Sequence, residues 1–247
     1  MAHWIEKGML AVLGVAVFTS ACAKEGSESG PAEQAYYSQI GVENNVVTSA
    51  HSPALKIKID PAFDYLGRHD IRIRDVAAGE RLVFADIDGD DAARMIILQF
   101  EGFNDGVEGA YRYDLSNSPD VAGYKWRSNP YAFNIKESIK NNPGAEPDST
   151  AQFLTRKSVA YPDDWMMWRS LTITTDDAKN ELIIFYVEDL ASTGKRLDDI
   201  YDADGENTDY WRSLMPDLER RANASFQLSP LEREDWQAIP RYFDSME

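Results

Sequence analysis

The chain has 247 residues, of which 43% are hydrophobic and 11% aromatic, and this is enough for one domain with a sizeable core. Its 25 basic and 42 acidic residues give a formal charge of −17, which would repel nucleic-acid phosphates and anionic lipid headgroups. Cys22 is the only cysteine, so an intrachain disulfide and a multi-cysteine metal site are excluded.

The first 22 residues have the layout of a secretory signal. Gly8 to Phe18 form an uninterrupted apolar run, and the small residues Ser20 and Ala21 lead directly to Cys22. The run is shorter than the roughly 20 apolar residues that a transmembrane helix needs. The tripeptide Ser20-Ala21-Cys22 resembles the lipobox of a bacterial lipoprotein precursor. The alternative is an ordinary secreted protein that is cleaved nearby and keeps Cys22 as a free thiol.

The resemblance implies that Cys22 is acylated and anchors the mature chain to the membrane. Ala23 and Lys24 follow it, and the lack of Asp there implies sorting to the outer membrane, facing the periplasm. Residues 23–33 (AKEGSESGPAE) are small, polar and charged, as in a flexible tether. We expect a signal peptide over residues 1–21, a lipid-anchored tether over 22–53 and a single domain over 54–247.

Short runs of β-branched and aromatic residues predict antiparallel strands. Residues 55–59 (LKIKI) alternate between apolar and charged side chains, which is typical of a half-buried strand. Residues 81–103 are two apolar runs joined by an Asp/Gly turn, a pattern that predicts a β-hairpin. Residues 165–174 and 181–189 predict a second hairpin, and the apolar centre of 181–189 indicates burial on both faces.

The two predicted hairpins share a local pattern. Asp-Asp-Ala precedes three consecutive aliphatic residues at the same offset, once from Asp90 and once from Asp176. This indicates either an internal duplication or the common appearance of any two hairpins that enter buried strands.

Helical signals gather in the second half of the chain. Residues 150–159 predict a short helix after a loop, and an apolar stripe over 211–218 predicts another, split or kinked at Pro216. Ser229 followed by Pro230 has the composition of a helix start. We therefore expect an α+β domain built on a curved antiparallel sheet, sandwich-like or partly barrel-like, with C-terminal helices packed against it.

Known catalytic and metal-binding motifs fit this sequence poorly. The acidic turn at 86–91 invites a calcium interpretation, but Asp91 stands where an EF-hand needs Gly and Ile97 where it needs Glu. A solvated turn is therefore the favoured interpretation of these residues. The mature chain has two histidines, His51 and His69, and the sequence places neither beside a serine and an acid. We predict no catalytic residue, no metal site and no cofactor.

Polar residues inside apolar strands are the remaining candidates for a site. Because burial of a lone charge is costly, such residues reach solvent, pair with one another, or line a polar pocket. A row of arginines could be a solvated face or bind an anion, and two tryptophans could stack on a ligand or belong to the core. The candidate ligand-binding residues are Arg68, Arg72, Arg74, Gln99, Glu101, Trp165, Trp168, Arg169 and Glu188.

These features predict a lipid-anchored cell-envelope protein without catalytic activity. It would bind a small or amphipathic ligand in the concave face of the sheet, or an envelope partner, and would contact the membrane through acylated Cys22. One alternative is an envelope hydrolase with carboxylates such as Glu101 and Glu188 as acid and base, which glycosidic chemistry places about 5 to 9.5 Å apart. Another is a structural or assembly lipoprotein without a pocket, with an apolar surface patch for its partner.

Overall fold

The computed structural model of the chain describes residues 40–50 and 53–232. The signal-like segment and Cys22 lie outside the described residues, so signal cleavage and acylation stay predictions. Among the described residues, no helix combines the length and the apolar character that crossing a membrane requires.

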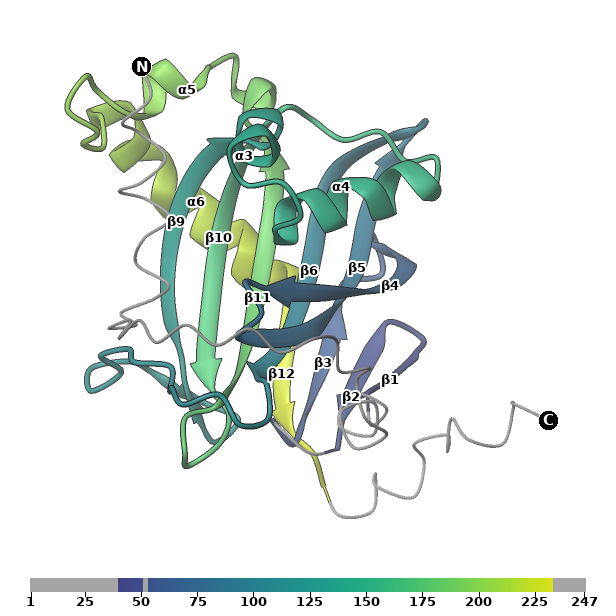
Figure 1. Ribbon diagram of the computed structural model, residues 1–247. Coiled ribbons are helices and arrows are strands. Elements are labelled where there is room, and N and C mark those ends of the chain that lie inside the picture. Colours follow the sequence, from purple (N-terminus) through teal and green to yellow (C-terminus); the bar gives the residue numbers. More distant parts are fainter. Residues whose placement is uncertain (1–39, 51–52, 233–247) are drawn as a thin grey trace.

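A six-stranded antiparallel sheet forms the centre of the fold (Figure 1). Both predicted hairpins are confirmed, and they lie next to each other in the middle of this sheet. The edge strands pair on one side only, so the sheet is open rather than closed into a barrel. In spatial order the strands are β4 (Asp64–Ile73), β5 (Ala77–Asp88), β6 (Asp91–Phe103), β11 (Asn180–Asp189), β10 (Asp164–Ile173) and β9 (Arg127–Asn134).

The turns of the two central hairpins differ. Asp88 pairs with Asp91, which leaves a two-residue turn in which Gly89 has φ +66°. Glycine adopts this left-handed conformation without steric cost. The second hairpin has six residues, 174–179, between its strands. Leu98 and Ile184, which occupy equivalent positions in the two similar segments, pair directly across β6 and β11. The internal duplication stays a prediction.

A four-stranded sheet, in the order β1-β2-β3-β12, corrects two predictions. β1 (Ile40–Glu43) and β2 (Val46–Ser49) occupy part of the predicted tether, because β2 pairs with β3 (Leu55–Ile59). β12 (Phe226–Pro230) contains the predicted helix start at Ser229, which instead pairs with Lys56 of β3. A small separate hairpin joins β7 (Asp120–Val121) to β8 (Tyr124–Lys125).

The helices lie on both sides of the six-stranded sheet. Figure 1 shows α3 (Ile135–Asn141) and α4 (Glu146–Arg156) in front of it and α6 (Asp209–Ser225) behind it. The helix predicted over 150–159 is therefore present, but it begins earlier. α6 continues through Pro216 without a break, and its Thr208 cap accepts a hydrogen bond from Trp211 N. The short η2 (Leu190–Thr193) and α5 (Leu197–Ile200) connect β11 to α6.

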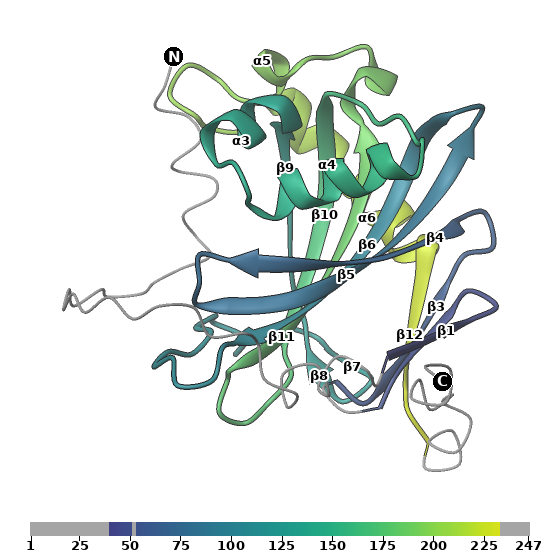
Figure 2. The ribbon, with the colours of Figure 1, turned by 45° about the vertical axis from the view of Figure 1, so that its right-hand side comes forward.

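Alternate residues of the central strands belong to two separate hydrophobic cores, one on each face of the sheet. Successive side chains of a strand point to opposite faces of the sheet. On one face Ile97 joins a core that includes Leu154 of α4. On the other face Ile96 joins a core that includes Ile57 of β3 and Trp211 of α6. Figure 2 shows the four-stranded sheet at an angle to the larger one, at the lower right of the view. We call the first side the α4 face and the second the α6 face.

Candidate functional site

The nine predicted ligand-binding residues do not converge on one site. Gln99 and Glu101 have the parity of Ile97 and lie on the α4 face, whereas Glu188 has the parity of Ile184 and lies on the α6 face. Glu101 is paired with Glu181, seven residues before Glu188, which is about 23 Å along a strand. The proposed acid and base Glu101 and Glu188 therefore cannot act on one substrate.

Glu188 is part of an ion pair on the α6 face. Arg221 of α6 donates from Nε and Nη2 to its two carboxylate oxygens, at 2.6 and 2.9 Å. The Tyr186 hydroxyl donates to the same carboxylate at 2.5 Å. These bonds tie α6 to β11, so Glu188 has a structural role that satisfies its buried charge.

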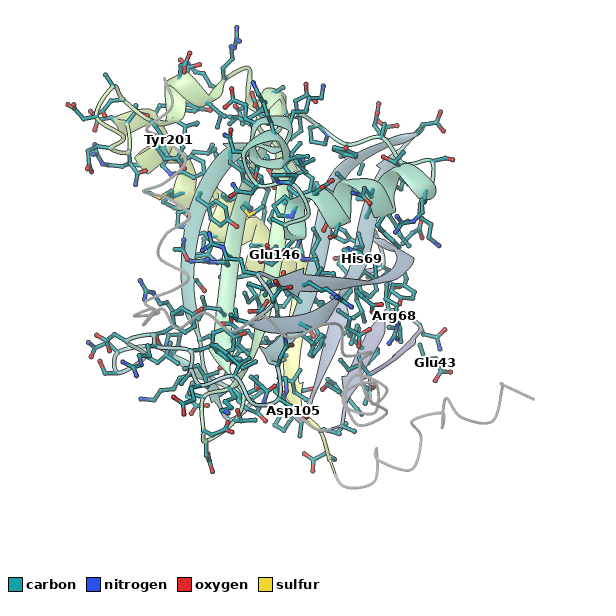
Figure 3. The ribbon with its side chains drawn as sticks, in the orientation of Figure 1. Glu43, Arg68, His69, Asp105, Glu146 and Tyr201 are labelled. Carbon is teal, nitrogen blue, oxygen red and sulfur yellow. The ribbon has the colours of Figure 1, made fainter. Side chains whose placement is uncertain are left out.

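The three arginines of β4 and its turn also separate. Arg68 donates to Glu80 at 3.1 Å and to the carbonyl of Ile40 at 2.9 Å (Figure 3). Arg72 and Arg74 are exposed, and Arg74 lies in the turn after β4 with φ +46°. Burial raises the pKa of Glu80 to about 7, and the neighbouring Arg68 opposes this shift. Arg68 thus joins β4 to β5 and to the start of β1.

The two tryptophans belong to different cores. Trp165 lies in the core of the α4 face and donates to the Pro162 carbonyl at 2.7 Å, and Trp168 lies in the core of the α6 face. They cannot stack on one ligand from opposite sides of a sheet.

Arg169 is half-buried, donates to Asn129 Oδ1 at 2.9 Å and lies 5.6 Å from the ring centre of Tyr131.

A connected polar network runs through the α4 face from α4 to the lower end of β6. Arg81 is buried and donates to Gln99 Oε1 at 2.6 Å, to Thr150 Oγ1 at 2.7 Å and to the Glu146 carbonyl at 3.0 Å. Gln99 in turn donates to the carboxylate of Glu101. Figure 3 shows Glu146 on the side of the sheet that α4 covers. Gln99 therefore bridges the Arg81 guanidinium and the Glu101 carboxylate through two hydrogen bonds.

His69 is the other titratable residue at this end of the network. Its Nε2 lies 3.4 Å from Thr150 Oγ1, and its ring stacks on Phe153 at 5.0 Å. Burial lowers the pKa of His69 to about 4, and the nearby charge of Arg81 contributes in the same direction. His69 is therefore neutral at physiological pH.

A pair of buried carboxyl groups ends the network. Glu101 and Glu181 are opposite each other on β6 and β11 and are only 3% and 1% exposed. Burial raises the pKa of both groups, and the pKa of Glu181 is raised further by the charge of Glu101. Glu101 accepts hydrogen bonds from Gln99 and from the Tyr111 hydroxyl, so it is the better stabilised anion. Burial therefore favours the protonated form of both carboxyl groups, and it does so more strongly at Glu181.

Glu181 is incompletely satisfied in this arrangement. Within the described residues neither of its oxygens has a hydrogen-bond partner of normal geometry. The Glu101 carboxyl and the Tyr113 hydroxyl are nonetheless near enough to influence its pKa. A buried acceptor without a full set of donors is energetically unfavourable, and it marks the point where a donor from a ligand would be best received.

A long irregular segment covers the carboxyl pair. Residues 104–119 contain no helix or strand and follow directly after β6. The segment is held by Tyr111 N, which donates to the Ala178 carbonyl at 2.7 Å, and by Asn104 N, which donates to the Val76 carbonyl at 2.9 Å. Segments of this length without secondary structure are uncommon in compact domains and often close over binding sites. We call the carboxyl pair and this cover the carboxyl-pair site.

The sequence predicted only part of this site. Gln99 and Glu101 were candidates, but Arg81, Tyr111 and Glu181 were missed. Glu181 comes directly before an apolar run, and a charged residue at that position is typical of a solvated strand end, so it was not a candidate. The signal that could have revealed it is parity, because Glu181 and Ile183 share a face of β11 in the same way that Glu101 and Gln99 share a face of β6.

Two surface hollows are lined by neither Glu101 nor Glu181, although Leu115 of segment 104–119 lines one of them. One, of about 380 Å³, lies between α3 and α4 and is lined in part by Ile139, Gln152 and Tyr161. The other, of about 290 Å³, includes Tyr124 and Thr174 in its lining. Neither is lined by a predicted ligand-binding residue.

Two other features were considered in the sequence: the acidic turn at 86–91 as a calcium site, and an apolar surface patch as a contact for a partner. Asp86 accepts from Arg94 Nη2 at 2.5 Å, and across residues 40–50 and 53–232 no three potential metal ligands gather. In the same part of the chain, the exposed large hydrophobic residues are Tyr65 on β4 and Val121 on β7, which belong to different sheets.

Comparison of the chain with protein-family models, with curated proteins and with solved structures found no match.

Proposed function

We propose that this chain is a lipid-anchored cell-envelope protein whose domain binds a small ligand at the carboxyl-pair site without transforming it. The anchor rests on the lipobox-like Ser20-Ala21-Cys22 and the apolar run before it. Acylated Cys22 would be the membrane contact, at the outer membrane and facing the periplasm. We also propose a sandwich-like arrangement, in which the four-stranded sheet and α6 cover the α6 face and the carboxyl-pair site lies on the opposite, α4 face.

One observation carries the binding proposal. A buried carboxyl pair with an unsatisfied member lies under a 16-residue segment that contributes two tyrosines, Tyr111 and Tyr113. Burial of two carboxyl groups together disfavours folding, because each loses its hydration and the charged forms repel each other. Such an arrangement is expected where a ligand compensates part of this cost.

The hydrolase alternative fits this pair less well. Glu101 and Glu181 are directly opposite on β6 and β11, and each acts on the pKa of the other at short range. Glycoside hydrolysis needs its two carboxyl groups about 5 Å apart or more, to leave room for the anomeric carbon or a water molecule. The pair is therefore better suited to receive a donor group from a ligand than to act as acid and base across a glycosidic bond.

Mass spectrometry of the protein extracted from its own host in mild detergent tests this proposal. We expect the intact mass of a chain that begins at Cys22 with two or three acyl chains. Native conditions should preserve an additional noncovalent mass. An unmodified chain that is cut elsewhere would remove the anchor, and an acylated chain that never carries a small molecule would contradict the binding function.

A further inference from the structure

Three aromatic rings lie next to one another beside the carboxyl pair. Phe103 and Tyr111 have ring centres 4.8 Å apart, and Tyr111 and Tyr113 have nearly parallel rings with centres 6.4 Å apart. Tyr111 also donates its hydroxyl hydrogen to Glu101 at 2.8 Å, which fixes its ring against the pair. Aromatic rings attract cations within about 6 Å through their negative faces, most strongly where water is excluded.

The charge balance of the site selects the kind of ligand. The buried Arg81 guanidinium is linked through Gln99 to Glu101, whereas neither oxygen of Glu181 has a hydrogen-bond donor among the described residues. Two more charged residues act on the pKa values of the pair in opposite directions. Glu146 raises the pKa of Glu101, and Arg169 lowers the pKa of Glu181. Arg81 supplies one positive charge for two carboxyl groups, so one further positive charge would balance both groups in their ionised form.

We propose that the carboxyl-pair site binds the ammonium group of a small organic amine between the carboxyl groups of Glu101 and Glu181. This inference rests on the proposed binding function and names its ligand class. The amine enters as R–NH₃⁺ and donates hydrogen bonds to both carboxylates. The O–H bond of Glu181 breaks, one proton leaves to solvent, and no covalent bond forms to the ligand. The aromatic rings cover the ammonium carbon chain.

Segment 104–119 determines access to this site. The two carboxyl groups are almost fully covered, so an amine reaches them only when the segment lifts from β11. The backbone bonds that hold the segment include those from Tyr111 N to Ala178, in the turn before β11, and from Asn104 N to Val76. Gly106, with φ +79°, gives the segment a bend that other residues adopt only with strain.

Calorimetric titration of the full chain in mild detergent tests the inference. The probe is butylammonium, which stays protonated between pH 6 and 8 as a lysine side chain does. Butan-1-ol is the neutral control of similar shape. We expect butylammonium to bind with release of about one proton, measured in two buffers of different ionisation enthalpy, and its affinity to rise up to about tenfold per pH unit. Butan-1-ol should not bind.

Two variants locate the binding. Glu181→Gln preserves a neutral side chain of the same shape but has no proton to exchange, so butylammonium binding and proton release should both be lost. Glu80→Gln removes a buried carboxyl from the opposite face of the sheet and should bind butylammonium as the wild type does. Circular dichroism and melting of both variants show that they are folded.

The outcomes separate the inference from the function beneath it. Unchanged butylammonium binding by Glu181→Gln, or binding without proton release, would overturn the inference. No binding by the wild type would also overturn it, and a noncovalent mass in native spectra would then leave the binding function standing with a different ligand. If native spectra show no bound molecule, yet butylammonium binds as expected, the site chemistry is supported.

Discussion

Glu80 provides the sharpest test of how this fold balances buried charge. Its side chain is 4% exposed, and its only salt bridge is to Arg68 among the residues that the structure describes. The pKa of Glu80 rises from 4.5 to about 7 in the folded protein, mainly because of burial. At about 1.4 kcal/mol for each pKa unit, this difference corresponds to about 3 kcal/mol.

The sign of the effect follows from proton binding. Between pH 4.5 and 7 the folded state keeps the Glu80 proton and the unfolded state loses it, so the folded state binds more protons. The contribution of Glu80 to stability is therefore fully present below pH 4.5 and is lost as the pH rises through about 7. Glu80→Gln cannot lose a proton and should escape this destabilisation.

Urea unfolding at pH values from 4 to 8 measures the effect. The free energy of unfolding should fall by about 3 kcal/mol less in Glu80→Gln than in the wild type over this range. Glu101 and Glu181 change stability in the same direction, but they are present in both proteins, so their contribution cancels in the difference. Glu137→Gln, at an exposed site of α3, is the matched control. A flat difference curve between Glu80→Gln and the wild type would refute the reasoning.

Three further substitutions test the packing of the central sheet. Ile97→Asp places a charge in the core of the α4 face and should lower the free energy of unfolding by more than about 4 kcal/mol; unchanged near-UV circular dichroism and melting would contradict the buried hairpin. Gly79→Ala places a Cβ 2.8 Å from Glu101 Cα and closer still to the Phe100 carbonyl, so it should destabilise by about 1 to 3 kcal/mol in urea unfolding. Tyr201→Phe removes the hydroxyl that accepts from Ala132 N at 2.8 Å on the edge strand β9, and about 1 kcal/mol of stability should be lost, with faster amide exchange at Ala132.

Local sequence signals predicted β3 and the strands of the two central hairpins. Apolar alternation in residues 55–59 and the turn at Gly89 depend only on neighbours along the chain, so they could be read before any pairing was known. The same local reasoning failed at Ser229. Its helix-start composition is overridden because Ser229 pairs with Lys56, which is distant in the sequence. β1 and β2 were missed for a related reason, since four-residue strands have little periodicity of their own.

The candidate site shows where local information ends. The sequence by itself determined that Glu101 is a polar residue within a buried strand, because period-two alternation places it on the face of Ile97. Only the register of β6 against β11 decided that its partner is Glu181 and that Glu188 lies on the other face. Registers between strands about 80 residues apart are set by the packing of the whole sheet, and no local pattern encodes them.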